Sequence, residues 1–137
     1  MIKKVIKLVV VFICFFNVTA CDKGTISTEK KSDIDFTIME EADVPDELDD
    51  IIKGKKEKKF KLSYSDKENT YIVVGYGEQS TGGYSITVDE LFLTENAIYI
   101  NTTLVGPEEN ELVLKAKTYP YIVVKIEYMD KNIVFDE

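Results

Sequence analysis

The residue types that most often carry catalysis are scarce in this chain of 137 residues. It contains no histidine and no tryptophan, it has only two cysteines, and all of its basic residues are lysines. Without histidine, neither a Ser-His-Asp triad nor a Cys-His pair can form, and histidine-based zinc sites are excluded as well. The 25 acidic residues could still supply a pair of carboxylates for acid–base chemistry, but none of them stands in a recognisable motif. We therefore expect a protein that is not an enzyme and that needs no cofactor and no metal.

Residues 75–83, with the sequence GYGEQSTGG, form a glycine-rich segment that has to be considered as a phosphate-binding loop. The segment has neither the glycine spacing of a dinucleotide-binding fingerprint nor the Gly-Lys-Ser/Thr ending of a P-loop. A strand is expected to follow it, so no helix N-terminus would face a phosphate. Thr81, Gly82 and Gly83 suit a tight turn instead, because glycine adopts positive φ without strain. Such a turn can be purely structural or can present its tip to a partner.

The N-terminal residues predict export and attachment to a membrane. A lysine-rich start is followed by the apolar run of residues 8–16, which is too short to span a membrane and is typical of a signal peptide. Val18-Thr19-Ala20-Cys21 then resembles the bacterial lipobox, whose cysteine receives a lipid. We expect residues 1–20 to be the lipoprotein signal peptide and Cys21 to be the lipid attachment site, although an ordinary signal peptide with an unrelated cysteine remains the alternative.

Two acyl chains on Cys21 would anchor the protein stably to the cell membrane, with the domain on the extracytoplasmic side. Residues 21–33 are polar and are expected to form a flexible tether. Residues 34–137 then form a single domain, which has no disulfide because the other cysteine leaves with the signal peptide.

The charge of the chain argues against one class of partner. Its net charge is −8, and removal of the lysine-rich signal peptide would make it more negative. Nucleic acid is therefore not expected as a partner, because it requires a basic surface. Six lysines do gather within residues 53–61, after an acidic stretch at residues 40–50. This cluster could dock lipid headgroups or a charged partner, but a solvated helix end followed by a charged loop is the simpler interpretation.

Alternation of apolar and polar residues predicts that the domain is mostly β-structure. The candidate strands cover residues 34–38, 60–64, 71–76, 84–88, 91–93, 98–104, 112–117, 122–128 and 133–135. Residues 71–76 and 84–88 are expected to pair as a hairpin through Thr81-Gly82-Gly83, and residues 71–76 read as a central strand buried on both faces. One helix is expected between Pro45 and Gly54. We predict a mainly β fold of the α+β class, either an antiparallel β-sandwich or a curled sheet of about seven to eight strands, with one short N-terminal helix.

Tyrosines near the glycine-rich segment and near the end of the chain indicate a possible binding surface. Tyr84 follows the predicted turn, and Pro120 stands between Tyr119 and Tyr121. Packing on a strand is the alternative, because a tyrosine ring is often buried while its hydroxyl stays in water. Together with Thr81, Gly82 and Gly83, these four residues make up the candidate partner-binding set.

Two motifs in combination resemble the C-terminal domain of the PrcB family. They are Thr81-Gly82-Gly83-Tyr84-Ser85-Ile86 and, further along, Thr118-Tyr119-Pro120-Tyr121, with Gly77, Pro107 and the segment Val44-Pro45-Asp46-Glu47-Leu48 in the expected order. The resemblance covers about residues 34–128. The family's namesake is an accessory subunit of a bacterial surface protease complex. The resemblance therefore implies a non-catalytic, exported interaction domain that could assist a subtilisin-like or other extracytoplasmic protease.

Two other functions remain open. The segment Ser80-Thr81-Gly82-Gly83-Tyr84 also looks like the Thr-Thr-Gly-Tyr loop of chagasin-type cysteine-protease inhibitors, although Gly82 replaces the second threonine and the Arg-Pro-aromatic loop of those inhibitors is absent. Binding of cell-wall glycan or of a small ligand would rest only on the tyrosines and carboxylates.

Overall fold

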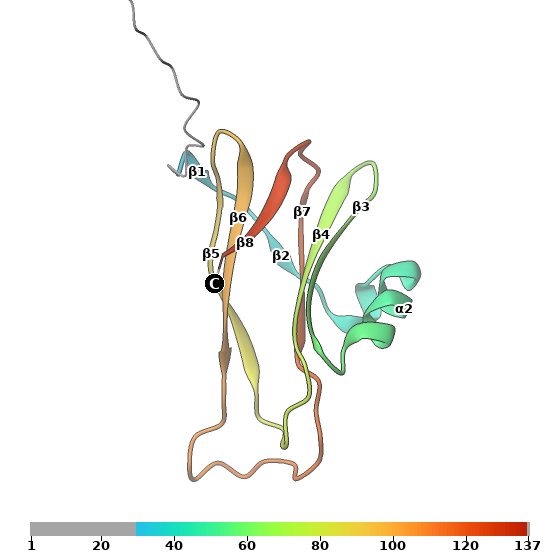
Figure 1. Ribbon diagram of the computed structural model, residues 1–137, viewed down its shortest axis with the longest axis vertical. Coiled ribbons are helices and arrows are strands. Elements are labelled where there is room, and N and C mark those ends of the chain that lie inside the picture. Colours follow the sequence, from blue (N-terminus) through green and yellow to red (C-terminus); the bar gives the residue numbers. More distant parts are fainter. Residues whose placement is uncertain (1–29, 137) are drawn as a thin grey trace, which may run out of the picture.

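Residues 30–136 form two four-stranded β-sheets with one helix packed on the outside of one sheet, as described by a computed structural model (Figure 1). The first sheet has the strand order β1-β5-β6-β8, and the second has the order β2-β7-β4-β3. The prediction of a mainly β sandwich with one short helix is therefore confirmed. The predicted signal peptide, Cys21 and most of the predicted tether lie outside the described residues. Within residues 30–136, no helix is long and apolar enough to cross a membrane.

The strands and helices have the following bounds: β1 Ser32–Asp33, β2 Thr37–Ile38, the 3-10 helix η2 Glu41–Asp43, α2 Asp46–Lys55, β3 Lys59–Ser65, β4 Asn69–Tyr76, β5 Ser85–Leu93, β6 Ala97–Val105, β7 Tyr121–Glu127 and β8 Asn132–Asp136.

The predicted hairpin between residues 71–76 and 84–88 is wrong, because β4 and β5 belong to different sheets. β4 pairs with β3 on one side and with β7 on the other, so neither of its edges is free for β5. β5 pairs instead with β1 and β6. Residues 77–84 therefore carry the chain from one sheet to the other across one end of the sandwich (Figure 1).

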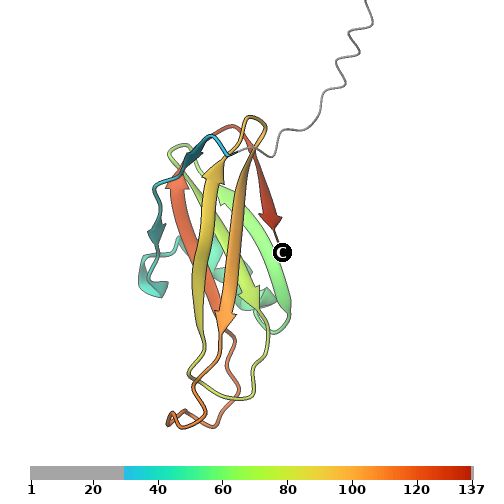
Figure 2. The ribbon, with the colours of Figure 1, turned by 90° about the vertical axis from the view of Figure 1, so that its left-hand side faces the viewer.

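The predicted strand at residues 34–38 is present only at its end, as β2, and a second short strand, β1, precedes it. β1 pairs with β5 at an edge of the first sheet, and β2 pairs with β7 at an edge of the second. Figure 2 shows these two short strands along one side of the sandwich. β1 begins at Ser32, so the ordered structure reaches into the predicted tether of residues 21–33. All strand pairs are antiparallel in the described residues except β6 with β8, which run parallel.

The apolar core lies in two layers, one on each face of β4 and β7. The residues packed between the two sheets are Ile72, Val74, Leu91, Ile98, Ile100, Ile122, Val124 and Ile126. On the other face, Leu48 and Ile52 of α2 are fully buried against Tyr71, Val73 and Val123. Each fully buried side chain of this size contributes about 1.5–3 kcal/mol to the free energy of unfolding. Burial on both faces explains why residues 71–76 are continuously apolar, as predicted for a central strand.

Helix α2 carries its charges in the order that favours a helix. Asp46 and Glu47 lie in its first turn and Lys53 and Lys55 in its last, so each group of charges opposes the partial charge of that helix end. The hydroxyl of Tyr64, on β3, donates a hydrogen bond of 2.8 Å to Glu47 Oε2, and this bond raises the pKa of Tyr64. The bond adds a polar link between helix and sheet to the apolar contacts beneath it.

Candidate partner-binding surface

Most of the predicted partner-binding residues lie in two loops at one end of the sandwich. The first loop, residues 77–84, joins β4 to β5, and the second, residues 106–120, joins β6 to β7. Both loops lie at the bottom of Figure 1, whereas β1, where the described chain begins, lies near the top. We call the two loops together the two-loop platform.

Four hydrogen bonds of 3.0 Å or shorter join the two loops. Gln79 and Thr118 exchange a pair of backbone bonds, with N···O distances of 2.8 Å and 3.0 Å. Thr118 Oγ1 donates to the carbonyl oxygen of Thr81 at 2.6 Å, and the N–H of Gly82 donates to the carbonyl oxygen of Leu114 at 2.8 Å. These bonds hold the loops as one unit and restrict their motion relative to each other.

Gly83 and Tyr84 make contacts between the loops instead of forming a free tip. Gly83 has a φ of 86°, and a Cβ at this position would lie 2.6 Å from Val113 Cγ1 and 3.0 Å from Pro107 Cβ. The half-buried ring of Tyr84 lies beside Gly106, where an added Cβ would be 3.4 Å from the ring. The glycine at position 83 is therefore required both by its backbone conformation and by the close approach of the second loop.

Tyr119 and Pro120 connect the platform to the rest of the domain. The hydroxyl of Tyr119 lies 3.5 Å from Glu78 Oε1, to which it donates a hydrogen bond. Lys56 Nζ, from the residue that follows α2, lies 5.5 Å from the centroid of the Tyr119 ring. The carbonyl oxygen of Pro120 accepts a hydrogen bond of 3.0 Å from the N–H of Tyr76, at the end of β4. Each of these half-buried residues thus has a contact that supports the loop position.

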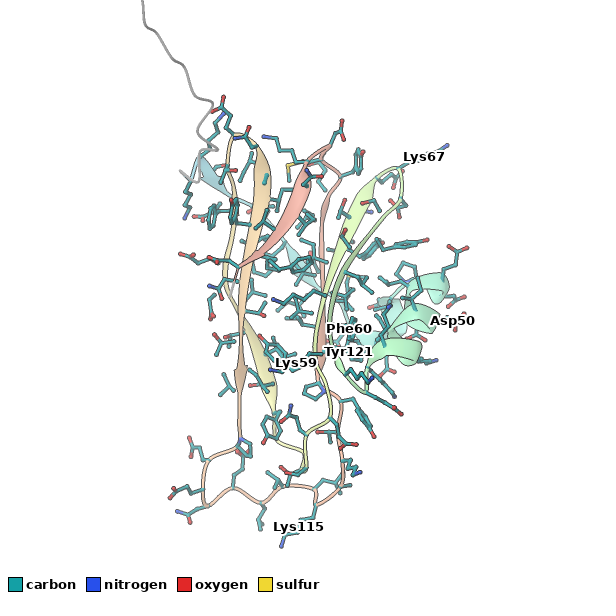
Figure 3. All side chains as sticks on the ribbon, viewed as in Figure 1. Asp50, Lys59, Phe60, Lys67, Lys115 and Tyr121 are labelled. Carbon is teal, nitrogen blue, oxygen red and sulfur yellow. The ribbon has the colours of Figure 1, made fainter. Side chains whose placement is uncertain are left out.

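Tyr121 lies apart from the other candidates, on the face of the second sheet that α2 covers. Its ring packs with the helix-side core, next to Phe60 on β3 (Figure 3). Burial raises the pKa of the Tyr121 hydroxyl, and the carboxylates of Glu41 and Asp49 raise it further. The structure therefore brings Thr81, Gly82, Gly83 and Tyr84 together with the second loop, but it places Tyr121 in a packing role.

Two exposed leucines in the second loop were not predicted as site residues. Leu112 is 101% exposed and Leu114 is 70% exposed, the highest values for large apolar side chains in the described residues. The predicted strand at residues 112–117 is wrong, because this segment is a loop that crosses the end of the sandwich, and the isolated bridge between Gln79 and Thr118 comes only after it. Since Val113 turns toward Gly83, the side chains on either side of it face solvent. From the sequence of this segment alone, a strand with one buried face cannot be distinguished from a loop with exposed apolar side chains.

An acidic turn precedes the leucines. The N–H of Glu111 donates to the carbonyl oxygen of Glu108 at 3.0 Å, and Glu111 Oε2 accepts a bond of 3.1 Å from the N–H of Glu108. Both residues are exposed, as is Glu109 between them. Lys115 follows the leucines and projects from the lower edge of the platform (Figure 3). The platform thus presents an apolar pair beside a fixed cluster of carboxylates.

Exposed leucines beside a cluster of carboxylates are the main surface feature of the platform. Residues 30–136 contain no group of three or more Asp, Glu, His or Cys side chains that could hold a metal ion. Exposed apolar side chains next to polar ones are typical of protein interaction sites.

Comparison with known proteins connects the platform to one family. A family model described as PrcB C-terminal matches residues 70–127. The match supports membership of the PrcB family over this part of the chain. The match runs from β4 to the end of β7 and includes both loops of the platform, so it confirms the resemblance seen in the two sequence motifs. Searches of the curated proteins and of the solved structures found no significant match.

Proposed function

We propose that this protein is a lipid-anchored, extracytoplasmic interaction protein without catalytic activity, and that it serves as an accessory subunit of a surface protease complex. The observation that carries the proposal is the exposure of Leu112 and Leu114 on loops held together by four hydrogen bonds of 3.0 Å or shorter. Exposed apolar side chains cost solubility, so a loop fixed in this position is best explained by a partner that covers it.

The position of the platform supports this function. The described chain begins at Lys30, near the end of the sandwich opposite the platform (Figure 1). A lipid on Cys21 would hold that opposite end close to the membrane. The platform would then point away from the membrane, where a partner protein could reach it.

The platform also indicates what the partner surface should look like. Leu112 and Leu114 require an apolar depression, and the nearby carboxylates of Glu108, Glu109 and Glu111 favour basic residues at its rim. Because the loops are already fixed, little conformational entropy is lost on binding. We therefore propose an apolar pocket with a basic rim on the partner protease.

Inhibition of a protease, by a loop like that of chagasin, is the second candidate. It would require residues 81–84 to enter the active-site cleft. In the structure, however, the N–H of Gly82 is bonded to Leu114 and Gly83 packs beside Val113. The leucines of the second loop are more exposed than Thr81, Gly82 and Tyr84 and favour the accessory function.

Crosslinking on intact cells, followed by mass spectrometry, tests the proposal. The native protein should capture one protease, and a Leu112→Ser/Leu114→Ser variant should lose it. Ile51→Ser is the matched control, because it removes an exposed apolar side chain from α2, away from the platform. Equal capture by the native protein and the double variant would show that the partner does not bind through Leu112 and Leu114. Recovery of scattered neighbours or peptidoglycan fragments alone would contradict a protease partner.

An activity assay on the captured protease separates the two candidates. An accessory subunit should leave proteolysis unchanged or increase it when it is added to the purified protease. An inhibitor should lower proteolysis in a manner that saturates at one inhibitor per protease.

A further inference from the structure

The outer edge of β3 is a second feature that could bind another molecule. β3 is the last strand in the order β2-β7-β4-β3, and no other described strand pairs with its outer side. Its seven residues are long enough to take an added strand. An unpaired edge of this length presents a row of backbone donors and acceptors.

The register of the sheet shows which backbone groups point outward. The N–H of Tyr76 donates to Pro120, on the β7 side of β4. Tyr76 therefore turns its hydrogen-bonding groups away from its β3 neighbour, Lys59. In an antiparallel pair such residues alternate with hydrogen-bonded ones, so Lys59 and Ser63 turn their own N–H and C=O groups toward the outer edge.

A cavity of about 500 Å³ lies beside this edge, between β3 and β4 of one sheet and β6 and β8 of the other. Its floor is apolar and includes Val74, Ile100 and Phe135. Lys59 lies at its rim, on the side of β3 that faces the other sheet (Figure 3). A side chain from a strand added to β3 could enter this space.

The charge around the edge is opposite to that of the whole chain. Lys59 and Lys61, on β3, belong to a run of six lysines at residues 53–61, whereas the chain as a whole has a net charge of −8. Lys59 and Lys61 both line the cavity, and Asp136 is the one carboxylate among the lining residues. Lys61 Nζ lies 5.9 Å from the centroid of the Phe135 ring. A second copy of this chain is a poor occupant, because pairing β3 with β3 would bring two lysine-rich segments together.

We propose that the outer edge of β3 binds an extended, acidic polypeptide segment of another protein as an added strand. Backbone hydrogen bonds to the edge would supply affinity, and alternate side chains would enter the cavity. Acidic side chains of the segment would lie near Lys59. This site does not include the exposed leucines of the two-loop platform and does not depend on the function proposed for them.

Lysines at a strand edge can also serve only to prevent sheets from pairing, and a binding experiment distinguishes the two roles. The full chain, purified in detergent, is titrated into a fluorescent heptapeptide of alternating glutamate and valine, and binding is followed by anisotropy. A second peptide carries N-methyl groups on alternate amides, which removes the donors needed for strand pairing. We expect the N-methylated peptide to bind at least about tenfold more weakly. Equal binding of the two peptides, or no binding at millimolar concentration, would overturn the proposal.

A pair of charge-reversal variants tests the place of binding. Lys59→Glu alters the cavity rim, and Lys58→Glu makes the same change in net charge at an exposed residue that does not line the cavity. Lys59→Glu should weaken peptide binding about fivefold more than Lys58→Glu. Equal weakening would indicate general attraction to the lysine cluster. Complete displacement of the peptide by inorganic polyphosphate would likewise assign the lysines to a polyanion and refute strand addition.

Discussion

Replacement of Gly83 by alanine should loosen the two-loop platform. Gly83 has a φ of 86°, and holding an L-residue in the left-handed region costs about 1–2 kcal/mol. The new Cβ would lie only 2.6 Å from Val113 Cγ1, and overpacking of this kind adds about 1–3 kcal/mol. We therefore expect Gly83→Ala to lower the free energy of unfolding by about 2–5 kcal/mol.

Urea denaturation measures the total loss, and amide hydrogen exchange shows where it occurs. If the platform opens locally, the N–H groups of Gly82 and Thr118 should lose protection, because they donate to Leu114 and Gln79 of the opposite loop. Protection in β4 should then fall much less.

Gly54→Ala is the matched control for a glycine substitution. Gly54 lies within α2, and nothing lies within 4 Å of the position of its added Cβ. Alanine is the better helix former, so this change should raise stability by about 0.5–1 kcal/mol.

Repeating Gly83→Ala in a chain that already carries Val113→Ala separates the cost of the backbone conformation from the cost of overpacking against Val113. In a Val113→Ala chain the closest clash is removed and the approach to Pro107 remains, so Gly83→Ala should cost less than in the native chain but at least the backbone contribution of about 1–2 kcal/mol. If Gly83→Ala changed stability by less than about 0.5 kcal/mol in the native background and left both amides protected, the contact between the loops would be refuted.

Three further substitutions test other parts of the fold. Gly75→Ala should cost about 1–3 kcal/mol in thermal melting, because its Cβ would lie 2.1 Å from Phe60 Cε1, and a simultaneous Phe60→Ala change should abolish that cost. Backbone N–H groups donate to the Asp66 carboxylate and hold its pKa below the ordinary 3.8, so this carboxylate stabilises the fold above pH 3.8 and loses that effect as the pH falls through the lowered pKa. Asp66→Asn should therefore make acid unfolding less steep. An unchanged acid unfolding curve would contradict this. Thr94→Val should lower the free energy of unfolding, measured in urea, by about 1–3 kcal/mol, because the buried hydroxyl accepts a hydrogen bond of 3.0 Å from the N–H of Ala97. The same substitution should increase hydrogen exchange at the Ala97 amide.

The sequence by itself determined the class of fold and the family. Alternating apolar residues predicted strands, because a strand with one buried face needs an apolar residue at every second position. The continuous apolar run at residues 71–76 indicated burial on both faces, and the structure places β4 between the other sheet and α2. The helix was predicted by Pro45, the acidic residues after it and the apolar face that includes Leu48 and Ile52. The glycine and tyrosine motifs at residues 81–86 and 118–121 were sufficient to indicate the PrcB family, which the match at residues 70–127 bears out.

Only the tertiary structure decided which strands pair and which apolar residues remain outside the core. β4 and β5 carry patterns that suit a hairpin, but β4 already has partners on both edges, and strand pairing depends on segments far away in the chain. The same limit applies to the second loop, where Leu112-Val113-Leu114 alternates like a strand. Whether an apolar side chain is buried depends on what packs against it. At the end of the sandwich, Val113 packs beside Gly83, while the side chains of Leu112 and Leu114 remain mostly exposed to solvent.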